Sequence, residues 1–336
     1  MGRLFMTGTL DILIPHYHES PEEMTPLLDS LAVQQGVDLD NLGVIIAYDG
    51  PDATPLPVGE WAERYPFKIT HTQGEKAGVS ATRNLALDTS EAEYVMFCDA
   101  DDMFCDVCGL FIIFREMGIG EFDTLMSRFR EQTKDQDGNM TFIDHETDQT
   151  FVHGKVHRRQ YLIDKGIRFN PKLTIHEDSF FNIQCQALAD PERAKYCPTA
   201  FYLWRWRENS VCRHDKDYIL KTFVNMLDSN DALIGEFVKR MRNDLANQYV
   251  GFMVWDSYYT MNKPDWRNKV NKGYRDKTER RFAAYFKKHK EQWDALTEQE
   301  KMIISNGVRQ RSVMEGMLIE ELTITQWLRR IEKMNR

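Results

Sequence analysis

Three carboxylate side chains within residues 99–102 are the strongest candidate for chemistry in this sequence. Asp99, Asp101 and Asp102 directly follow the apolar run 94–98. Carboxylates this close repel one another unless a cation lies among them. Mg²⁺ and Mn²⁺ prefer oxygen ligands and often share them with substrate phosphates. The residue types and their spacing therefore indicate a divalent-cation site, although an isolated Asp-x-Asp is more often an ordinary solvated turn.

A buried strand is needed to position these carboxylates, and the first half of the sequence supplies several. Apolar runs at 10–14, 42–48 and 67–70 are typical of strands, and helical patterns lie between them. This alternation predicts an α/β fold with a mostly parallel mixed sheet. Because ligands bind beyond the carboxyl ends of such strands, we expect Asp49 and Asp99 to share one rim of the sheet.

The pattern changes in the second half of the chain. Residues 136–138 predict a hairpin turn between candidate strands at 122–130 and 141–156. From about Tyr218 onward, apolar residues recur at helical spacing, and two capping-box patterns begin at Thr297 and Thr323. We therefore predict an α/β domain over residues 1–215 and an all-helical C-terminal region over residues 216–336.

One stretch of the helical region, 280–290, combines basic and aromatic residues. Such a charge run usually marks the solvated face of a helix. The alternative that we retain is a contact with a membrane surface or with an acidic polymer. The residues concerned are Arg280, Arg281, Phe282, Tyr285, Phe286, Lys287, Lys288 and Lys290.

The composition argues against several classes of protein. No apolar run approaches the ~20 residues that span a bilayer, and the N-terminus carries no signal-peptide pattern. The net charge of −9 gives no support to nucleic-acid binding. The six cysteines lack the paired spacing of a zinc site, and Cys98 and Cys185 are expected to be buried, reduced thiols. We therefore expect a cytoplasmic protein, or one peripheral to the inner membrane surface, without an integral membrane segment.

A series of short motifs, taken in order from residue 11 to about residue 213, resembles the family-2 glycosyltransferases. The resemblance implies a GT-A fold, which is a Rossmann-like nucleotide-sugar fold. It also implies inverting transfer of a sugar from a nucleotide diphosphate, with UDP-sugar as the default donor and Mn²⁺ or Mg²⁺ as cofactor. The motifs are Ile14-Pro-His-Tyr-His-Glu19, Tyr48-Asp-Gly-Pro-Asp52, Lys76-Ala-Gly-Val-Ser-Ala-Thr-Arg-Asn84, Phe97-Cys-Asp-Ala-Asp-Asp102, His153-Gly-Lys-Val-His-Arg-Arg-Gln-Tyr161, Ile175-His-Glu-Asp-Ser-Phe-Phe181 and Tyr202-Leu-Trp-Arg-Trp-Arg-Glu-Asn-Ser210.

By position, the resemblance assigns a donor site to the strand ends. Pro15, Tyr17 and Glu19 would wall the pocket of the base, Asp49 would accept a hydrogen bond from the base, and Asp99 would bind the ribose. Asp102 would support the metal ligands from behind. The remaining assignments are Lys76, Gly78 and Arg83 near the base and diphosphate, Asp101, Asp99 and His214 as metal ligands, Lys155 near the donor sugar or acceptor, and Arg207 on the phosphates.

Several of these assignments have a structural alternative. Arg83 also suits an ion pair within the fold, Lys155 suits a solvated lysine on a strand, and a lone His214 is more often simply hydrogen-bonded. Residues 204–207 resemble a loop that closes over the donor. Alternation along a strand would send its two Trp and two Arg side chains to opposite faces, so at most one pair can point into the site.

The resemblance also supplies a candidate general base. The acceptor hydroxyl loses its proton as it attacks, and a positioned carboxylate can accept that proton. In the family this base is the Asp of a Glu-Asp pair at a helix start, which here is Asp178. Glu177 would orient the acceptor or the base. Helix capping is the ordinary explanation for such a pair when it stands alone.

The sequence leaves the donor base and the acceptor open. His18, Tyr48 and residues 50–52 depart from the family pattern, and the first two put the base identity in doubt. The competing functions are a sugar-phosphate nucleotidyltransferase and an inactive glycan- or nucleotide-sugar-binding module. The first generally needs a Gly-rich loop just after the first strand, whereas this chain has no glycine in residues 15–19. The acceptor can be a glycan, a lipid-linked intermediate, a protein or a modified nucleotide. The helical region is expected to shape the acceptor side or to form a homodimer contact.

Overall fold

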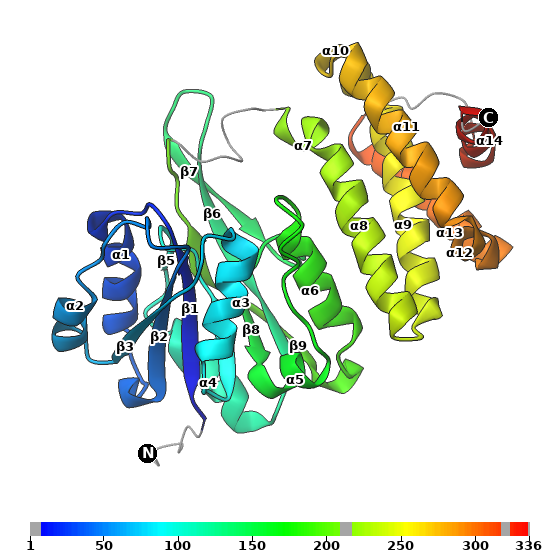
Figure 1. Cartoon of the computed structure of the whole chain (residues 1–336). Coiled ribbons are helices and arrows are strands. Elements are labelled where there is room, and N and C mark those ends of the chain that lie inside the picture. Colours follow the sequence, from blue (N-terminus) through cyan, green and yellow to red (C-terminus); the bar gives the residue numbers. More distant parts are fainter. Residues whose placement is uncertain (1–7, 209–216, 317–322, 335–336) are drawn as a thin grey trace. The chain divides into compact units, whose positions relative to one another are not determined.

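The computed structural model describes residues 8–208, 217–316 and 323–334, and the chain forms two compact units, Met1–Arg207 and Glu208–Arg336 (Figure 1). In the described residues of the first unit, nine strands form one sheet in the order β3-β2-β1-β4-β8-β6-β9-β5, and β7 pairs with β6. The strands are β1 (Leu10–His16), β2 (Leu42–Tyr48), β3 (Lys68–Gln73), β4 (Tyr94–Phe97), β5 (Met103–Phe104), β6 (Thr124–Lys134), β7 (Met140–His145), β8 (Lys155–Arg158) and β9 (Ala194–Trp204).

Helices cover both faces of this sheet, so the unit has three layers. One face packs against α1 (Pro21–Ala32), α2 (Val58–Arg64) and α4 (Gly109–Ile119). The other packs against α3 (Val79–Thr89), α5 (Arg159–Asp164) and α6 (Glu177–Ala187). Because strand side chains alternate, Ile12 and Ile14 of β1 enter the first core and Leu13 enters the second. The α/β fold agrees with the prediction.

The first four strands in space, β3, β2, β1 and β4, are all parallel, as the alternating pattern predicted. The other half of the sheet is mixed, since β8 runs antiparallel to both β4 and β6, whereas β9 is parallel to β6. The predicted hairpin turn at 136–138 joins β6 to β7.

The prediction of one continuous strand over residues 141–156 was wrong for the middle of that range. Residues 146–154 form a loop between β7 and β8, because the Asp148 carboxylate accepts the N–H groups of Thr150 (2.6 Å) and Phe151 (3.2 Å) and so closes a turn. Gly154, with φ +67°, then redirects the chain into β8. The strand β9 likewise ends at Trp204, so residues 205–207 lie beyond it and strand alternation does not apply to them.

All secondary-structure elements among the described residues of the second unit are helices, as predicted. Its helices are α7 (Tyr218–Lys221), α8 (Phe223–Lys239), α9 (Asn243–Met261), α10 (Pro264–Lys269), α11 (Lys272–Lys288), α12 (Lys290–Ala295), α13 (Glu298–Met314) and α14 (Ile324–Met334). Both predicted capping boxes form, at Thr297 with Glu300 and at Thr323 with Gln326. Within the part of the chain that is described, no helix combines the length and apolar character needed to cross a bilayer.

Helix α1 allows a matched test of the core. Leu31 has 0% of its surface exposed, whereas Val33, just after the helix, is 58% exposed. Leu31→Ala should lower the free energy of unfolding by about 2–5 kcal/mol through lost burial and a residual cavity. Val33→Ala should change it by less than about 0.5 kcal/mol. Urea denaturation of both variants measures the difference, and equal effects would contradict this packing.

Candidate active site

The carboxyl ends of β1, β2 and β4 meet at one rim of the sheet, because the three strands are parallel neighbours. Asp49 follows β2 directly. Its carboxylate accepts the backbone N–H groups of Ala77 (2.8 Å) and Gly78 (3.0 Å), just before α3. Gly78 has φ +85°, a conformation that L side chains rarely adopt. Asp49, predicted to meet the donor base, therefore lies at this rim and holds the loop that begins α3.

Within the predicted wall of the base pocket, Pro15 lies in β1, and residues 17–19 form a loop that is tied to two others. The Tyr17 hydroxyl donates to the Asp52 carboxylate (3.0 Å). Lys76 Nζ lies 3.0 Å from the same carboxylate and 4.1 Å from the centroid of the Tyr17 ring. Glu19 accepts the backbone N–H of Tyr17 (3.0 Å) and so closes the loop on itself. The structure thus brings Lys76 beside Tyr17, which lies 59 positions away in sequence.

Arg83, on α3, is the centre of the rim. Its side chain is 3% exposed, and its guanidinium donates to Asp99 (2.9 Å), Asp178 (2.5 Å) and Glu177 (3.3 Å). Burial opposes the charge, but the carboxylates of Asp178, Asp99 and Glu177 outweigh it and raise the pKa of Arg83. The ion-pairing role that the sequence left open for Arg83 is therefore present in the fold.

Asp178 lies in the first turn of α6. The chain enters this helix through His176, which adopts a left-handed conformation with φ +64°. The Asp178 carboxylate has one oxygen on Arg83 and accepts the Val152 backbone N–H (3.3 Å) at the other. Burial raises the pKa of Asp178 to about 8, with repulsion from Glu177 and Asp99 adding to the rise and Arg83 opposing it. A largely enclosed carboxyl group with a raised pKa is suited to acid–base work.

The three carboxylates that follow β4 have different surroundings. Asp99 faces Arg83, and Asp101 accepts a hydrogen bond from Arg207 (2.7 Å). Asp102 is fully buried and accepts the hydroxyl of Tyr202 (2.6 Å). Burial and repulsion from Asp99 raise the pKa of Asp101, and burial together with the other two carboxylates raises the pKa of Asp102 further.

His153 lies behind these carboxylates and was not among the predicted site residues. Its ring stacks between those of Phe151 (centroids 5.4 Å apart) and Tyr202 (4.9 Å apart). Burial lowers the pKa of His153 to about 3, so the imidazole is neutral at physiological pH. Nδ1 is buried without a hydrogen-bond partner among the described residues and lies 3.7 Å from the Asp102 carboxylate.

These residues fit a divalent cation. One ligand atom each from Asp99, Asp102 and His153 lie within 4.8 Å of one another. A cation there would relieve the repulsion between the carboxylates and give the buried Nδ1 atom a partner. The predicted set was Asp101, Asp99 and His214. Asp101 lies beside this cluster but is engaged by Arg207, and His214 is outside the described residues. A lone histidine before a strand carries no signal that would have found His153.

Lys155 begins β8 and is 1% exposed, so the solvated-lysine alternative was wrong. Its ammonium donates to the backbone carbonyl oxygens of Phe151 (2.5 Å) and His153 (3.4 Å). Burial lowers the pKa of Lys155 to about 8. The ammonium therefore fixes the backbone that carries both His153 and the Val152 N–H group that binds Asp178.

The segment after β9 closes over the acidic cluster from another side. Arg207 binds the carboxylates of both Asp101 and Glu23. Trp204, the last residue of β9, packs on Phe151, with ring centroids 4.8 Å apart. Arg207 therefore lies beside the carboxylates that follow β4, and its contact with the phosphates stays a prediction.

Comparisons with known proteins agree with this architecture. Residues 11–107 match the family model described as glycosyl transferase family 2. The minor teichoic acid biosynthesis protein GgaB of Bacillus subtilis is 26% identical over 115 residues, which are 34% of this chain and 11% of GgaB. The poly(ribitol-phosphate) beta-N-acetylglucosaminyltransferase TarS of Staphylococcus aureus strain Mu50 is 25% identical over 185 residues, or 52% of this chain and 31% of TarS. The matched part is thus less than a third of either relative's length.

Solved structures show the same fold. The crystal structure of S. aureus TarS 1–349 in complex with UDP-GlcNAc superposes with a TM-score of 0.66 at 17% identity, covering 92% of each chain. The mannosyltransferase PcManGT of Pyrobaculum calidifontis, in complex with GDP-Man and Mn²⁺, superposes with a TM-score of 0.52 at 14% identity, covering 98% of this chain and 85% of that one.

Three observations agree on the kind of fold. Acidic residues follow neighbouring parallel strands, residues 11–107 match the family model, and solved glycosyltransferases share the fold. The chain therefore has a GT-A fold, and residues 11–107 of that fold resemble glycosyl transferase family 2.

Proposed function

We propose that this chain transfers a sugar from a UDP-sugar to a hydroxyl group of a polyol-phosphate polymer, with inversion at the anomeric carbon. The observation that carries the proposal is the array in which the buried Arg83 links Asp178 to Asp99. This array puts a carboxyl group with a pKa of about 8 beside a cluster of carboxylates at the nucleotide end of the sheet.

Asp178 is the proposed general base. Its Oδ1 is held by Arg83, and its Oδ2 accepts the long Val152 N–H bond of 3.3 Å. An oxygen that accepts a single long hydrogen bond retains a lone pair for a substrate proton. Glu177, bound to the same guanidinium, would keep Arg83 and Asp178 in place.

The proposed reaction is a single displacement. The acceptor oxygen forms a bond to the anomeric carbon while the bond from that carbon to the diphosphate oxygen breaks. The electron pair leaves with the diphosphate, and the acceptor proton passes to Asp178. Attack opposite the leaving group inverts the configuration at the anomeric carbon.

The acidic cluster is proposed to serve the leaving group. When bound by Asp99, Asp102 and His153, or with the help of Asp101, Mn²⁺ or Mg²⁺ supplies Lewis acidity toward the departing diphosphate. Arg207 holds Asp101 and offers a guanidinium that suits phosphate oxygens. Asp49, Tyr17 and Lys76 remain proposed contacts of the nucleoside end.

The acceptor and donor follow from the relatives. TarS is named a poly(ribitol-phosphate) beta-N-acetylglucosaminyltransferase, and GgaB is named for minor teichoic acid biosynthesis. UDP-GlcNAc is therefore the first donor to test, with a polyol-phosphate oligomer as acceptor. The family match favours glycosyl transfer over nucleotidyl transfer, and turnover separates the enzyme from an inactive binding module.

The donor prediction is tested by thermal unfolding with UDP, UDP-GlcNAc, GDP, CDP and dTDP. A ligand at about 100 times its dissociation constant adds about 2.7 kcal/mol of stability, which raises the melting temperature by several degrees. We expect this shift with UDP and UDP-GlcNAc. A shift with GDP alone would indicate a GDP-sugar donor in place of a UDP-sugar. No shift with any nucleotide in a folded protein would contradict the donor site.

The metal ligands are tested by titrating Mn²⁺ in the presence of UDP, with EDTA as the metal-free reference. His153→Phe keeps the ring stack but removes Nδ1, and we expect it to raise the half-saturating Mn²⁺ concentration about tenfold or more. Asp101→Asn is the comparison. If only Asp101→Asn weakens Mn²⁺ binding, the metal is held by the ligands predicted from the sequence and not by His153.

The base is tested by Asp178→Asn. UDP binding should persist, while kcat should fall by about 10²–10⁴-fold because no group accepts the acceptor proton. The base works only when deprotonated, and its pKa is about 8. The wild-type kcat/KM should therefore rise with pH through about 8 and then level off, and this rise should vanish from the residual activity of the variant. Near-normal transfer by Asp178→Asn would exclude it as the base.

A further inference from the structure

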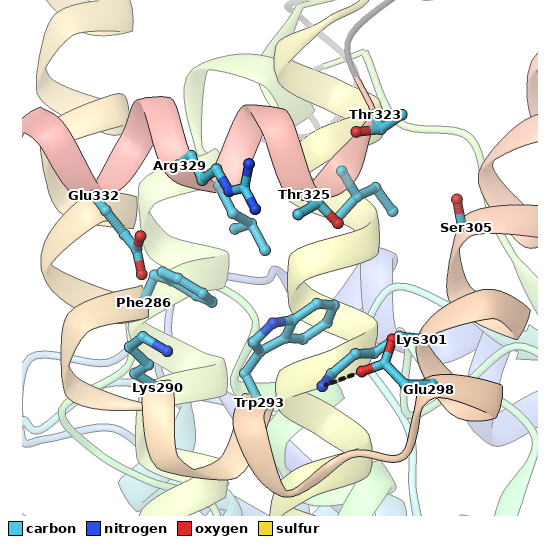
Figure 2. Close-up of a pocket in the computed structure, with 12 residues that line it drawn as sticks. Phe286, Lys290, Trp293, Glu298, Lys301, Ser305, Thr323, Thr325, Arg329 and Glu332 are labelled. Atoms are coloured by element: carbon cyan, nitrogen blue, oxygen red, sulfur yellow. Dashed lines mark hydrogen bonds and ion pairs between the residues drawn. The ribbon is translucent and has the colours of Figure 1, made fainter.

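The helical unit contains a cavity of about 320 Å³ between α11, α12, α13 and α14, and this cavity takes no part in the site described above (Figure 2). Its apolar wall comes from Phe286, Trp293 and Leu328, which are all buried. Ser305 and Thr325 contribute hydroxyl groups to the lining. The cavity is therefore amphipathic, with flat aromatic surfaces on one side and hydrogen-bonding groups on the other.

Three cations line the same cavity. Lys290 and Lys301 already bind acidic partners, Asp294 at 2.6 Å and Glu298 at 3.2 Å. The guanidinium of Arg329 points into the space above Trp293 (Figure 2) and forms no ion pair with the residues that the structure describes. The lining carries three cations and two carboxylates, Glu298 and Glu332. The cavity thus offers a guanidinium to an anion.

Different residues of the charge run at 280–290 have different surroundings. Phe282 and Tyr285 are buried in the helical core. Arg281 and Lys288 pair with Asp231 of α8 at 3.3 Å and 2.6 Å, as expected for a helix face with ordinary ion pairs. The C-terminal end of the run differs, because Phe286 and Lys290 line the cavity. Contact with an acidic polymer, one of the alternatives raised by the sequence, fits this end.

The lining identifies a class of ligand. A guanidinium binds phosphate through two parallel hydrogen bonds, and nearby ammonium groups add charge. An indole surface packs against the carbon face of a sugar or polyol, while hydroxyl groups bind its oxygens. Inorganic phosphate would use only the cations. A phosphate ester of a polyol uses both halves of the lining.

We propose that this cavity binds one phosphate-bearing repeat of the anionic acceptor polymer, with Arg329 on the phosphate and Trp293 beside the polyol. The inference rests on the proposed function, because it assumes that the acceptor is a polyol phosphate. One polymer could then be held by the helical unit at one repeat while another repeat reacts. Such tethering raises the effective concentration of acceptor hydroxyl groups without a new contact at the active site.

The test measures binding of a polyol-phosphate oligomer to the full chain by calorimetry. Arg329→Gln should weaken binding about tenfold or more, as the loss of a charged hydrogen bond implies. Lys290→Gln should weaken it less. Arg330→Gln is the matched control, since Arg330 is the neighbouring exposed arginine and does not line the cavity. Inorganic phosphate should bind more weakly than the oligomer, because it cannot use the aromatic wall.

Transfer kinetics give the second measurement. Arg329→Gln should raise KM for a long acceptor and leave kcat and the KM of a single-repeat acceptor unchanged. Equal oligomer binding by wild type and Arg329→Gln, or equal weakening by Arg330→Gln, would overturn the proposal. If the wild type binds the oligomer through Arg329 yet transfers no sugar to it, the proposed function fails while the cavity site stands.

Discussion

The buried guanidinium of Arg83 is the interaction on which the rest of the active site depends. It joins three carboxylates from two distant parts of the chain, Asp99 after β4 and Glu177 with Asp178 in α6. Without it, three half-buried carboxylates would face one another without a compensating charge, which is unfavourable for all three. The same interaction therefore closes α6 onto the sheet and determines the separation between the proposed base and the acidic cluster.

Much of this rim could be predicted from the sequence because the signals are local. An apolar run that ends in acidic residues identifies both a strand and its carboxyl end, so these runs alone predict that Asp49 and Asp99 share one rim. The order of the motifs then brings Asp178 to the same rim. The capping boxes at Thr297 and Thr323 are equally local, because each depends on residues three positions apart.

His153 and the burial of Lys155 could not be predicted in the same way. Both depend on β8 entering the sheet between β4 and β6, a pairing that joins segments more than 50 residues apart in the case of β4. A four-residue strand that starts with a lysine has no pattern that distinguishes an interior position from an edge. The cavity of the helical unit could not be predicted either, since its lining comes from four helices whose individual patterns show only which face is apolar.

The left-handed conformation of His176 has a consequence for how this fold can change. A non-glycine residue in the left-handed conformation costs about 1–2 kcal/mol. Here that conformation turns the chain so that Glu177 and Asp178 begin α6 in contact with Arg83. Substitutions that relaxed the backbone at this point would be favoured if stability alone were selected. Their benefit would be offset by a less well-defined approach to the helix that carries the proposed base. The entrance to α6 is thus a place where thermostability and activity make opposing demands on a single residue.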